Sequence, residues 1–541
     1  MAVTIVQVLG TALVVVLLRT VVGAIRRLYF HPISHIPGPK LAALTWWYEC
    51  YWDLFQESRF VFHIQELHKQ YGPIIRITPD EIHVNDVGFL DSVYAPSMSR
   101  RDKYPYQLKT LRIPGAIGAT ANHDLHRKRR EALSPFFSRR NVLYLEPVIT
   151  EKVEQLCRLI ARHASEKTPV NLSDALFAFS NEYVSLKVGS SELTGYSVVN
   201  NFLFAHQTDV LANEAKAATL RQNGNDLLMG ININKHFPWF PDFLESLPLS
   251  ISKPMMPPGL VDMLALFDCI VLTELQRVRA ELVGIMQAKS SGSTSGKQMG
   301  PTGKESVYDS VLDSPALPPS EKALLRLEQE GSLLVLAGTE SPAKTLNVVF
   351  YHLLANPSTL AKLRAELSTT KSSSWAELEK LPYLSAVLEE GNRLSFGVTA
   401  RTARIAHEPL TYTPSPYSVS AAGGSKSHVI PAGTPISITS LSAHTAATVF
   451  PSPYTFDPSR WLGDAGRELR KFQMAFNKGG RKCLGIELAR AELYLVTAAL
   501  VRGFEMELWE TGEGDVAFVH DYQVAMPRVG SKGVRVMARE L

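Results

Sequence analysis

The sequence predicts a mainly α-helical domain with small β-sheets (α+β) that follows an N-terminal membrane anchor. Three observations lead to this fold class. Helical periodicity dominates the chain as far as about Leu388, and short β-type runs occur at Pro73–Thr78 and Glu81–Val84. At 541 residues the chain exceeds the size at which one core usually stops growing, so one large domain and several smaller ones are both conceivable. No internal repeat is apparent, and we expect a single domain over residues 41–541.

The first 27 residues have a composition of their own. Ala2 to Leu18 carries no charge, and the apolar stretch continues past Arg19 to Ile25. At about 1.5 Å per residue a helix of this length is roughly long enough to cross a bilayer core of about 30 Å. A cleaved signal peptide is the alternative, but such a peptide begins with a positive charge and has a shorter apolar run. We expect residues 1–27 to form a single-pass anchor.

Positive charges follow the apolar stretch and none precedes it. They are Arg19, Arg26, Arg27 and Lys40. Because Lys and Arg tend to stay on the cytoplasmic side of a membrane, the body of the protein is expected in the cytosol. Residues 28–40 connect anchor and body and contain Pro37 and Pro39, which forbid helix and predict a stiff hinge.

Composition excludes several classes of function. The chain has 56 Lys+Arg against 52 Asp+Glu, and its basic clusters are too local for a nucleic-acid surface, so nucleic acid is not an expected partner. The four cysteines form neither a CxxC pair nor a plausible disulfide framework, which argues against a zinc site and suits a reducing compartment. Residues 289–304 are rich in Ser and Gly and predict a surface loop.

One segment between Phe237 and Pro258 combines aromatic residues, Met and Pro. Such a composition is typical of a segment that dips into a lipid surface or covers an apolar pocket. Ordinary loop packing explains it equally well, so both interpretations stay open.

The strongest chemical signal surrounds Cys483. Phe476, Gly479, Arg481 and Gly485 flank it in the pattern F-x-x-G-x-R-x-C-x-G. Glycines let a backbone turn tightly around a metal-ligating thiolate, and we expect this of Gly479 and Gly485. A cation two residues before the sulfur favours the thiolate, and so does the helix predicted over Ile486–Val501, which begins just after it. A lone cysteine is more often a buried structural thiol, but five fixed positions argue against chance.

A second signal lies in a helical pattern from about Ser320 to Ala355. Gly338 and Pro342 stand inside this helix, where both residue types are costly. Pro342 cannot donate to the carbonyl of Gly338, so a local kink and an unbonded acceptor are predicted. Such a defect suggests a functional position.

The Cys483 motif resembles the haem-binding loop of the cytochrome P450 family, and the residues after it resemble the helix that follows that loop. The resemblance covers nearly the whole chain, because anchor, proline hinge and the further motifs come in the family's order. It implies the family's fold, haem b (iron protoporphyrin IX) as cofactor, and Cys483 as the ligand of its iron.

The segment Leu336–Pro342 resembles the family's distal helix, with Ser341 in place of the usual threonine. The resemblance implies that Ser341 relays a proton to oxygen and that Glu340 resupplies the relay from solvent. Serine keeps the hydroxyl of threonine but lacks the methyl that fixes its rotamer, which leaves the details of proton delivery open.

Glu390 and Arg393 match the family's E-x-x-R pattern, and Arg460 lies in a loop similar to the one whose arginine joins that pair. On a helix, i and i+3 residues share a face, so an exposed ion pair is the simpler interpretation of the two residues alone. The resemblance implies instead a buried cluster of Glu390, Arg393 and Arg460 with a structural role.

Haem propionates are anions and require cations. The resemblance implies that Arg481, Arg130, Arg401 and His126 bind them. His126 and Arg130 share one helix face and match a W-x-x-x-R pattern with His in the Trp position, and Arg401 lies eight residues after Arg393. Any of these side chains alone is more often a solvated charge.

The implied activity is that of a haem-thiolate monooxygenase that oxidises an apolar small molecule with O2. Electrons from NADPH would come from a separate flavoprotein reductase, since the chain shows no nucleotide-binding or flavin module. The hinge and the segment around Ser341 resemble fungal microsomal members near the trichodiene-oxygenase-like branch. This implies secondary metabolism of a terpenoid or polyketide and an endoplasmic reticulum location. The alternatives are an internal rearrangement or dehydration without a reductase, and a non-catalytic haem protein.

Overall fold

The computed structural model describes residues 2–180, 211, 213–248, 283, 286–287, 307–418 and 426–541. The predicted loop at residues 289–304 and the second half of the aromatic segment, from residue 249, lie outside the described residues. The fold class is confirmed, because the described part is mainly helical and carries small sheets.

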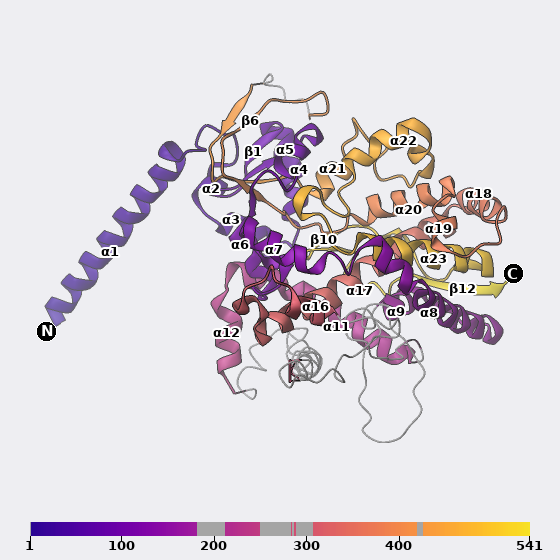
Figure 1. Ribbon diagram of the computed structural model, residues 1–541. Helices are drawn as coiled ribbons and strands as arrows, with labels where there is room; N and C mark the ends of the chain where they lie inside the picture. Colours follow the sequence, from indigo (N-terminus) through magenta and orange to yellow (C-terminus); the bar gives the residue numbers. More distant parts are fainter. Residues whose placement is uncertain are drawn as a thin grey trace.

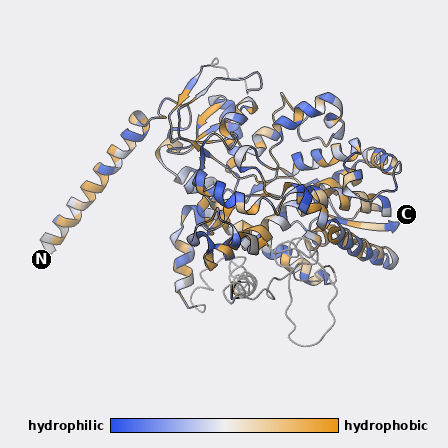
Figure 2. Ribbon diagram, in the orientation of Figure 1, coloured by the Kyte–Doolittle hydropathy of each residue, from blue (hydrophilic) through white to orange (hydrophobic). Residues whose placement is uncertain are grey.

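The N-terminal helix projects away from the body (Figure 1). It comprises α1 (Ala2–Ile25) and the π-helical turn η1 (Arg26–Phe30). The stretch Gln7–Phe30 is long and apolar enough to cross a membrane, and none of its most apolar window is buried against the protein. Figure 2 shows hydrophobic residues along the length of α1, as expected of a helix without a core-facing side.

The proline hinge is docked on the body. The backbone N–H of Arg76 donates to the carbonyl of Pro37 at 2.7 Å, and the Arg76 side chain donates to the carbonyl of Arg27 at 2.8 Å. Gly38 has a φ of +155°, and a Cβ there would lie 2.4 Å from the carbonyl oxygen of Arg76. The segment between α1 and the body is therefore held by hydrogen bonds and by a close backbone approach.

The largest sheet has five strands in the order β1-β2-β8-β5-β3. Its strands are β1 (Ile74–Arg76), β2 (Ile82–Val84), β8 (Pro435–Ser437), β5 (Arg404–Ala406) and β3 (Arg101–Lys103). The β2–β8 pair is parallel and the other pairs are antiparallel. The predicted strands at Pro73–Thr78 and Glu81–Val84 are thus confirmed as β1 and β2, which lie on the side of the body next to α1 (Figure 1).

Among the described residues, three smaller sheets accompany it. They consist of β4 (Val170–Asn171), β12 (Arg535–Glu540) and β9 (Phe504–Leu508); β6 (Leu410–Tyr412) and β7 (His428–Ile430); and β10 (His520–Asp521) and β11 (Ala525–Met526).

The longer helices form the rest of the body. They are α4 (Phe60–Tyr71), α7 (His123–Leu133), α8 (Arg139–Glu166), α9 (Leu172–Ser180), α11 (Glu214–His236), α12 (Trp239–Ser246), α17 (Leu324–Ala355), α18 (Pro357–Leu367), α20 (Pro382–Ser395) and α23 (Ile486–Gly503). Shorter ones are α2 (Lys40–Leu44), α3 (Trp47–Cys50), η2 (Tyr51–Phe55), α5 (Leu90–Val93), α6 (Pro105–Leu108), α16 (Val307–Asp313), α19 (Trp375–Leu378), α21 (Ser440–His444) and α22 (Gly463–Leu469). Helices α8, α18, α19, α20 and α23 gather on the side of the body remote from α1 (Figure 1).

Helix α17 is the centre of the helical packing. It contacts α9, α20 and α23, and its residues Leu346, Val349 and Phe350 are completely buried. The helix is continuous across Gly338 and Pro342, and the local kink and the unbonded carbonyl expected there stay predictions. The helices predicted over Ser320–Ala355 and Ile486–Val501 are confirmed as α17 and α23.

Candidate active site

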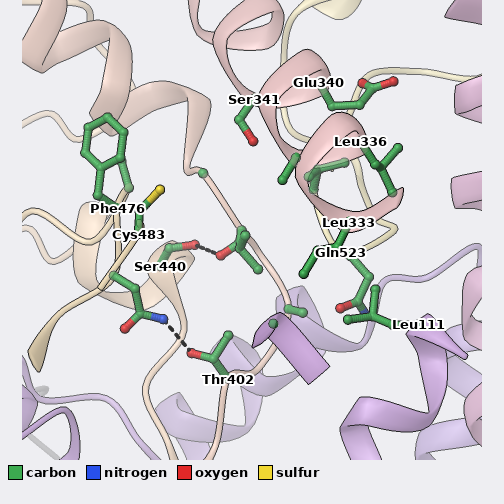
Figure 3. Close-up of a pocket in the computed structure, with 18 of the residues that line it drawn as sticks. Leu111, Leu333, Leu336, Glu340, Ser341, Thr402, Ser440, Phe476, Cys483 and Gln523 are labelled. Atoms are coloured by element: carbon green, nitrogen blue, oxygen red, sulfur yellow. Dashed lines mark hydrogen bonds between the residues drawn. The ribbon is translucent and has the colours of Figure 1, made fainter. Parts of the chain in front are cut away.

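A cavity of about 450 Å³ separates α17 from the loop before α23. Cys483 and Phe476 line it from the loop, and Ser341 lines it from α17 (Figure 3). Leu111, Leu333 and Leu336 add apolar side chains to the wall opposite Cys483 (Figure 3). The cavity thus brings the thiol of Cys483 and the hydroxyl of Ser341 to a largely hydrocarbon surface.

The loop that carries Cys483 depends on a tight turn at Gly479. Its φ is +68°, and a Cβ would lie 2.2 Å from the carbonyl oxygens of Tyr94 and Ala95. The loop closes where the backbone N–H of Cys483 donates to the carbonyl of Phe476 at 2.8 Å. Only glycine combines this φ with such a close approach, so the sequence expectation for Gly479 is met.

Gly485 does not play the same part as Gly479. It has an ordinary φ of −88° at the N-terminus of α23, and a Cβ would approach only Phe137, at 3.9 Å. The tight turn expected at the flanking glycines is therefore found at Gly479 and not at Gly485. Its contribution is electrostatic, since its backbone N–H points at the sulfur: burial raises the pKa of the Cys483 thiol, whereas the Gly485 N–H and Arg130 lower it.

Arg481 and Arg130 are held beside the cavity by backbone carbonyls. Arg481 donates to the carbonyls of Thr120 and Ala121 at 2.7 and 2.6 Å, and Arg130 donates to the carbonyl of Lys482 at 2.7 Å. Burial, with Arg404 nearby, lowers the pKa of Arg481 to about 9. Both guanidinium groups are fixed in place by these bonds, and neither forms an ion pair with a carboxylate among the described residues, although the charge of Asp102 acts on Arg481.

His126 lies in the same positively charged surroundings. It is buried on α7, and its pKa is lowered to about 2 by burial and by the charges of Arg481, Lys103, Arg130 and Arg404. The pKa of Lys103 is also well below its usual value, because of burial and the charges of Arg404 and Arg481. The positive charges in this group therefore repel one another, and an anion bound beside them would reduce the repulsion.

Arg404, at the start of β5, belongs to this group and was missed by sequence reasoning. It is buried, lines the cavity, and donates to the carbonyl of Thr402 at 2.6 Å. Burial lowers its pKa, and its guanidinium lies over the ring of Tyr94. The only signal in the sequence was a second arginine three residues after Arg401.

Arg401 has a different environment from Arg404. Its guanidinium donates to the carboxylates of Glu49 at 2.5 Å and Glu81 at 3.1 Å, and all three groups are buried. Burial lowers the pKa of Arg401, but the two carboxylates outweigh it and leave the pKa well above its usual value. Since carboxylates of the protein already neutralise Arg401, its predicted role with a propionate has no support in this geometry.

The cation group fits the anionic edge of a haem. Within the described part of the chain, Arg130, Arg404 and Arg481 form no ion pair with a carboxylate, although all three are largely enclosed. Uncompensated buried charge is costly, and two propionates beside these residues would remove the cost. A cavity with this rim and with Cys483 in its wall therefore suits haem.

Ser341 and Glu340 extend from different sides of α17 (Figure 3). Ser341 points into the cavity toward Cys483, whereas the carboxylate of Glu340 points away from it. Oε1 of Glu340 is buried and has no hydrogen-bond partner among the described residues. Burial raises the pKa of Glu340, and Lys344 and Arg221 oppose the rise.

The predicted structural cluster is confirmed. Arg393 binds Glu390 through two hydrogen bonds of 2.8 Å, and Arg460 reaches the same carboxylate at 3.2 Å. Trp461 Nε1 adds a 2.8 Å hydrogen bond to Glu390, which the sequence did not predict. Glu390 and Arg393 are completely buried, so the cluster joins α20 to the loop around Trp461 in the protein interior.

Comparison with known proteins decides the family. Residues 274–530 match the family model described as Cytochrome P450. The chain is 32% identical over 514 residues to the cytochrome P450 monooxygenase TRI4 of Trichoderma arundinaceum, which covers 93% of this chain and 90% of that protein.

The chain belongs to the cytochrome P450 family. It is 35% identical to the conidiogenone synthase PchP450 of Penicillium rubens, over 95% of each chain. It is 33% identical to the tryptophan 6-hydroxylase fscE of Fusarium equiseti, over 97% of this chain and 96% of that one.

As a cytochrome P450, the protein is a haem-binding monooxygenase that acts on a small molecule and receives electrons from a redox partner. The relatives named here are fungal enzymes, which agrees with the resemblance found in the sequence.

Proposed function

We propose that Cys483 is the thiolate ligand of haem b and that Arg130, Arg404, Arg481 and His126 surround its propionates. The observation that carries this proposal is the position of Cys483 in a cavity wall beside cations that have no carboxylate partner in the described structure. When bound, the haem supplies activation of O2 for insertion of one oxygen atom into the substrate.

Arg404 replaces Arg401 in this proposal. Both residues line the cavity, but Arg401 is bound to the carboxylates of Glu49 and Glu81, whereas Arg404 donates to the backbone carbonyls of residues 402 and 403. Arg401 then contributes by fixing the backbone from which Arg404 projects.

Ser341 and Glu340 are proposed to supply protons. The hydroxyl of Ser341 faces the cavity, where it holds a proton next to the reacting oxygen. Glu340 has an unpaired carboxylate oxygen and a raised pKa, so its protonated form persists to a higher pH than in water. Because the carboxylate points away from the cavity, transfer between the two residues requires a rotation of Glu340 or an intervening water.

The substrate is proposed to be mainly apolar and to be oxidised in a fungal secondary-metabolite pathway. The leucine-rich wall formed by Leu111, Leu333 and Leu336 supports the first part, and the relatives' names support the second. A terpenoid or polyketide skeleton would suit the leucine-rich part of the cavity that lies opposite Cys483.

The redox partner is proposed to be an NADPH-dependent flavoprotein reductase in the endoplasmic reticulum membrane. Helix α1 would be the single-pass anchor, with the catalytic domain in the cytosol. The apolar helix over Gln7–Phe30 and the arginines at its C-terminal end support this arrangement.

Reconstitution of the full-length protein with a fungal NADPH–cytochrome P450 reductase tests the proposed function. We expect substrate-dependent NADPH oxidation with incorporation of one atom of ¹⁸O2 into the product. Product formation without reductase and NADPH would instead indicate an internal rearrangement or dehydration. Normal haem binding without oxygen uptake on any substrate would indicate a haem-binding protein without catalysis.

A further inference from the structure

One end of the cavity is polar, in contrast to its leucine-rich wall. Asp521, at the end of β10, lines the cavity there. Its Oδ1 accepts a 2.6 Å hydrogen bond from Oγ1 of Thr399 and a 3.2 Å hydrogen bond from the backbone N–H of Gln523. These two bonds hold the carboxylate in one orientation.

The second oxygen of Asp521 has no donor. Among the described residues, none donates a hydrogen bond to Oδ2. Burial raises the pKa of Asp521 to about 6, with the charge of Asp53 adding to the rise and Thr399 opposing it. The group is therefore mainly ionised at neutral pH, and a charged acceptor with an unfilled site borders the cavity.

The neighbouring cations compensate for Asp521 only in part: the charges of Lys235 and Arg401 lower its pKa, but neither forms an ion pair with it in the described structure. Lys235 donates to Glu49 at 2.6 Å and to Asp53 at 2.5 Å, so its ammonium fills the space that these carboxylates and His236 would otherwise offer to a metal ion. His236 lies 2.8 Å from Asp53, and Arg401 is bound to Glu49 and Glu81.

The charges in this corner do not balance within the described structure. Four carboxylates, those of Glu49, Asp53, Glu81 and Asp521, face at most three cations, namely Lys235, Arg401 and a protonated His236. When all four carboxylates are ionised the corner therefore has an excess of negative charge, in line with the raised pKa of Glu81 and of Asp521, and a hydrogen-bond donor or a cation would relieve it.

Asn232 of α11 adds a second acceptor. Its Nδ2 donates to Oγ of Ser58 at 2.9 Å and to the carbonyl of Asp521 at 3.2 Å. Because a backbone carbonyl only accepts, Nδ2 must face it, and Oδ1 is left without a donor among the described residues. Asn232 also lines the cavity, so two acceptors from different elements meet at the same end.

This end is across the cavity from the thiolate. Gln523, whose N–H binds Asp521, lies opposite Cys483 in Figure 3. A group held at the polar end would therefore fix which part of a substrate extends toward Cys483.

We propose that Asp521 determines specificity by accepting a hydrogen bond on Oδ2 from a donor group of the substrate, either a hydroxyl or a protonated amine. Resting on the proposed function, this inference specifies the substrate class as an apolar skeleton with one donor group remote from the oxidised carbon. A carboxylate at that position of the substrate is excluded by like charge.

Alkylimidazoles provide a test that does not require the natural substrate. The imidazole nitrogen of such a probe ligates haem iron, and a chain carries a terminal group across the cavity. The probes end in hydroxyl, ammonium, methoxy or carboxylate, each prepared in a series of chain lengths. Dissociation constants are measured by spectral titration of the full-length holoenzyme.

At the chain length that spans the cavity, the hydroxyl and ammonium probes should each bind about tenfold more tightly than the methoxy probe, as expected for one hydrogen bond to a charged group. The carboxylate probe should bind most weakly. A preference for ammonium over hydroxyl would identify an amine substrate, and the reverse order an alcohol.

The Asp521→Asn variant keeps an acceptor for Thr399 and Gln523 but replaces Oδ2 with a donor. The hydroxyl-to-methoxy ratio should therefore fall to about one and the carboxylate probe should bind better than in the wild type. Asp464→Asn is the matched control, because the exposed Asp464 pairs only with Arg467, and it should leave all ratios unchanged.

Equal binding of the four probes to the wild type at every chain length, or the same order in Asp521→Asn, would overturn the inference. Failure of the proposed function looks different, because a protein without haem iron would show no imidazole-induced spectral change with any probe.

Discussion

Ser341 and Glu340 are adjacent in sequence, yet their side chains leave α17 in different directions (Figure 3). Ser341 faces the cavity that holds Cys483, and Glu340 is buried on another side with one unpaired oxygen. A proton supplied by Glu340 must therefore pass around the helix to reach the hydroxyl of Ser341.

The Glu340→Gln variant should uncouple electron use from product formation. Glutamine keeps the size of the side chain but cannot release a proton, so the supply to Ser341 stops. We expect product per NADPH to fall, by up to the roughly 10²–10⁴-fold that a positioned proton-transfer group typically contributes, while hydrogen peroxide rises. Chromatographic product yield and a peroxide assay measure both quantities. An unchanged yield would show that protons reach the cavity by another route.

Removal of Arg404 and removal of Arg401 should have opposite consequences. Arg404→Met relieves repulsion among buried cations and removes a propionate partner, so the apoprotein should fold normally while haem retention falls. Arg401→Met leaves Glu49 and Glu81 without their cation and should destabilise the protein by about 3–5 kcal/mol.

Haem-to-protein ratios and urea unfolding of the apoprotein separate these two outcomes. Should Arg401→Met lose haem without losing stability, the original assignment of Arg401 to a propionate would be restored.

Gly479 and Gly485 should differ in their tolerance of a methyl group. Gly479→Ala places a Cβ 2.2 Å from two carbonyl oxygens at a positive φ, so the loop must move and thiolate-ligated haem should be lost. Gly485→Ala meets only Phe137 at contact distance and should retain the loop. Absorption spectra of both purified variants provide the comparison, and equal loss in both would refute the distinction drawn between the two glycines.

His126 should make the apoprotein sensitive to acid. Its pKa is about 2 in the fold and about 6.5 in an unfolded chain, so the unfolded state binds a proton as pH falls below about 6.5, whereas the folded state does not. Stability is thus lost on acidification, and His126→Gln should reduce that loss. Unfolding free energies measured across this pH range test the sign. A steeper acid loss in His126→Gln than in the wild type would contradict it.

Sequence patterns were sufficient for the parts of the site that are local in the chain. The loop from Phe476 to Gly485 is closed by the backbone hydrogen bond between Cys483 and Phe476. The spacing of the motif residues along the chain is therefore enough to predict how the loop folds. Glu390 and Arg393 are one helical turn apart, and their pairing is equally local. Strands β1 and β2 and helices α17 and α23 followed from periodicity for the same reason.

Contacts between distant segments were beyond the sequence patterns. Arg401 differs from Arg404 as a candidate propionate ligand because Arg401 is bound to Glu49 and Glu81. Both glutamates lie more than 300 residues earlier in the chain. Likewise, the polar end of the cavity requires Asn232 of α11 to meet the β10–β11 hairpin, and neither segment alone indicates it.

The reduced, carbon-monoxide-bound absorption spectrum tests the central claim most directly. For the wild-type protein we expect the red-shifted Soret band of a thiolate-ligated haem, and for Cys483→Ala its loss together with monooxygenase activity. A wild-type protein without that band, or a Cys483→Ala variant that retains it, would contradict the assignment of Cys483 as the haem ligand.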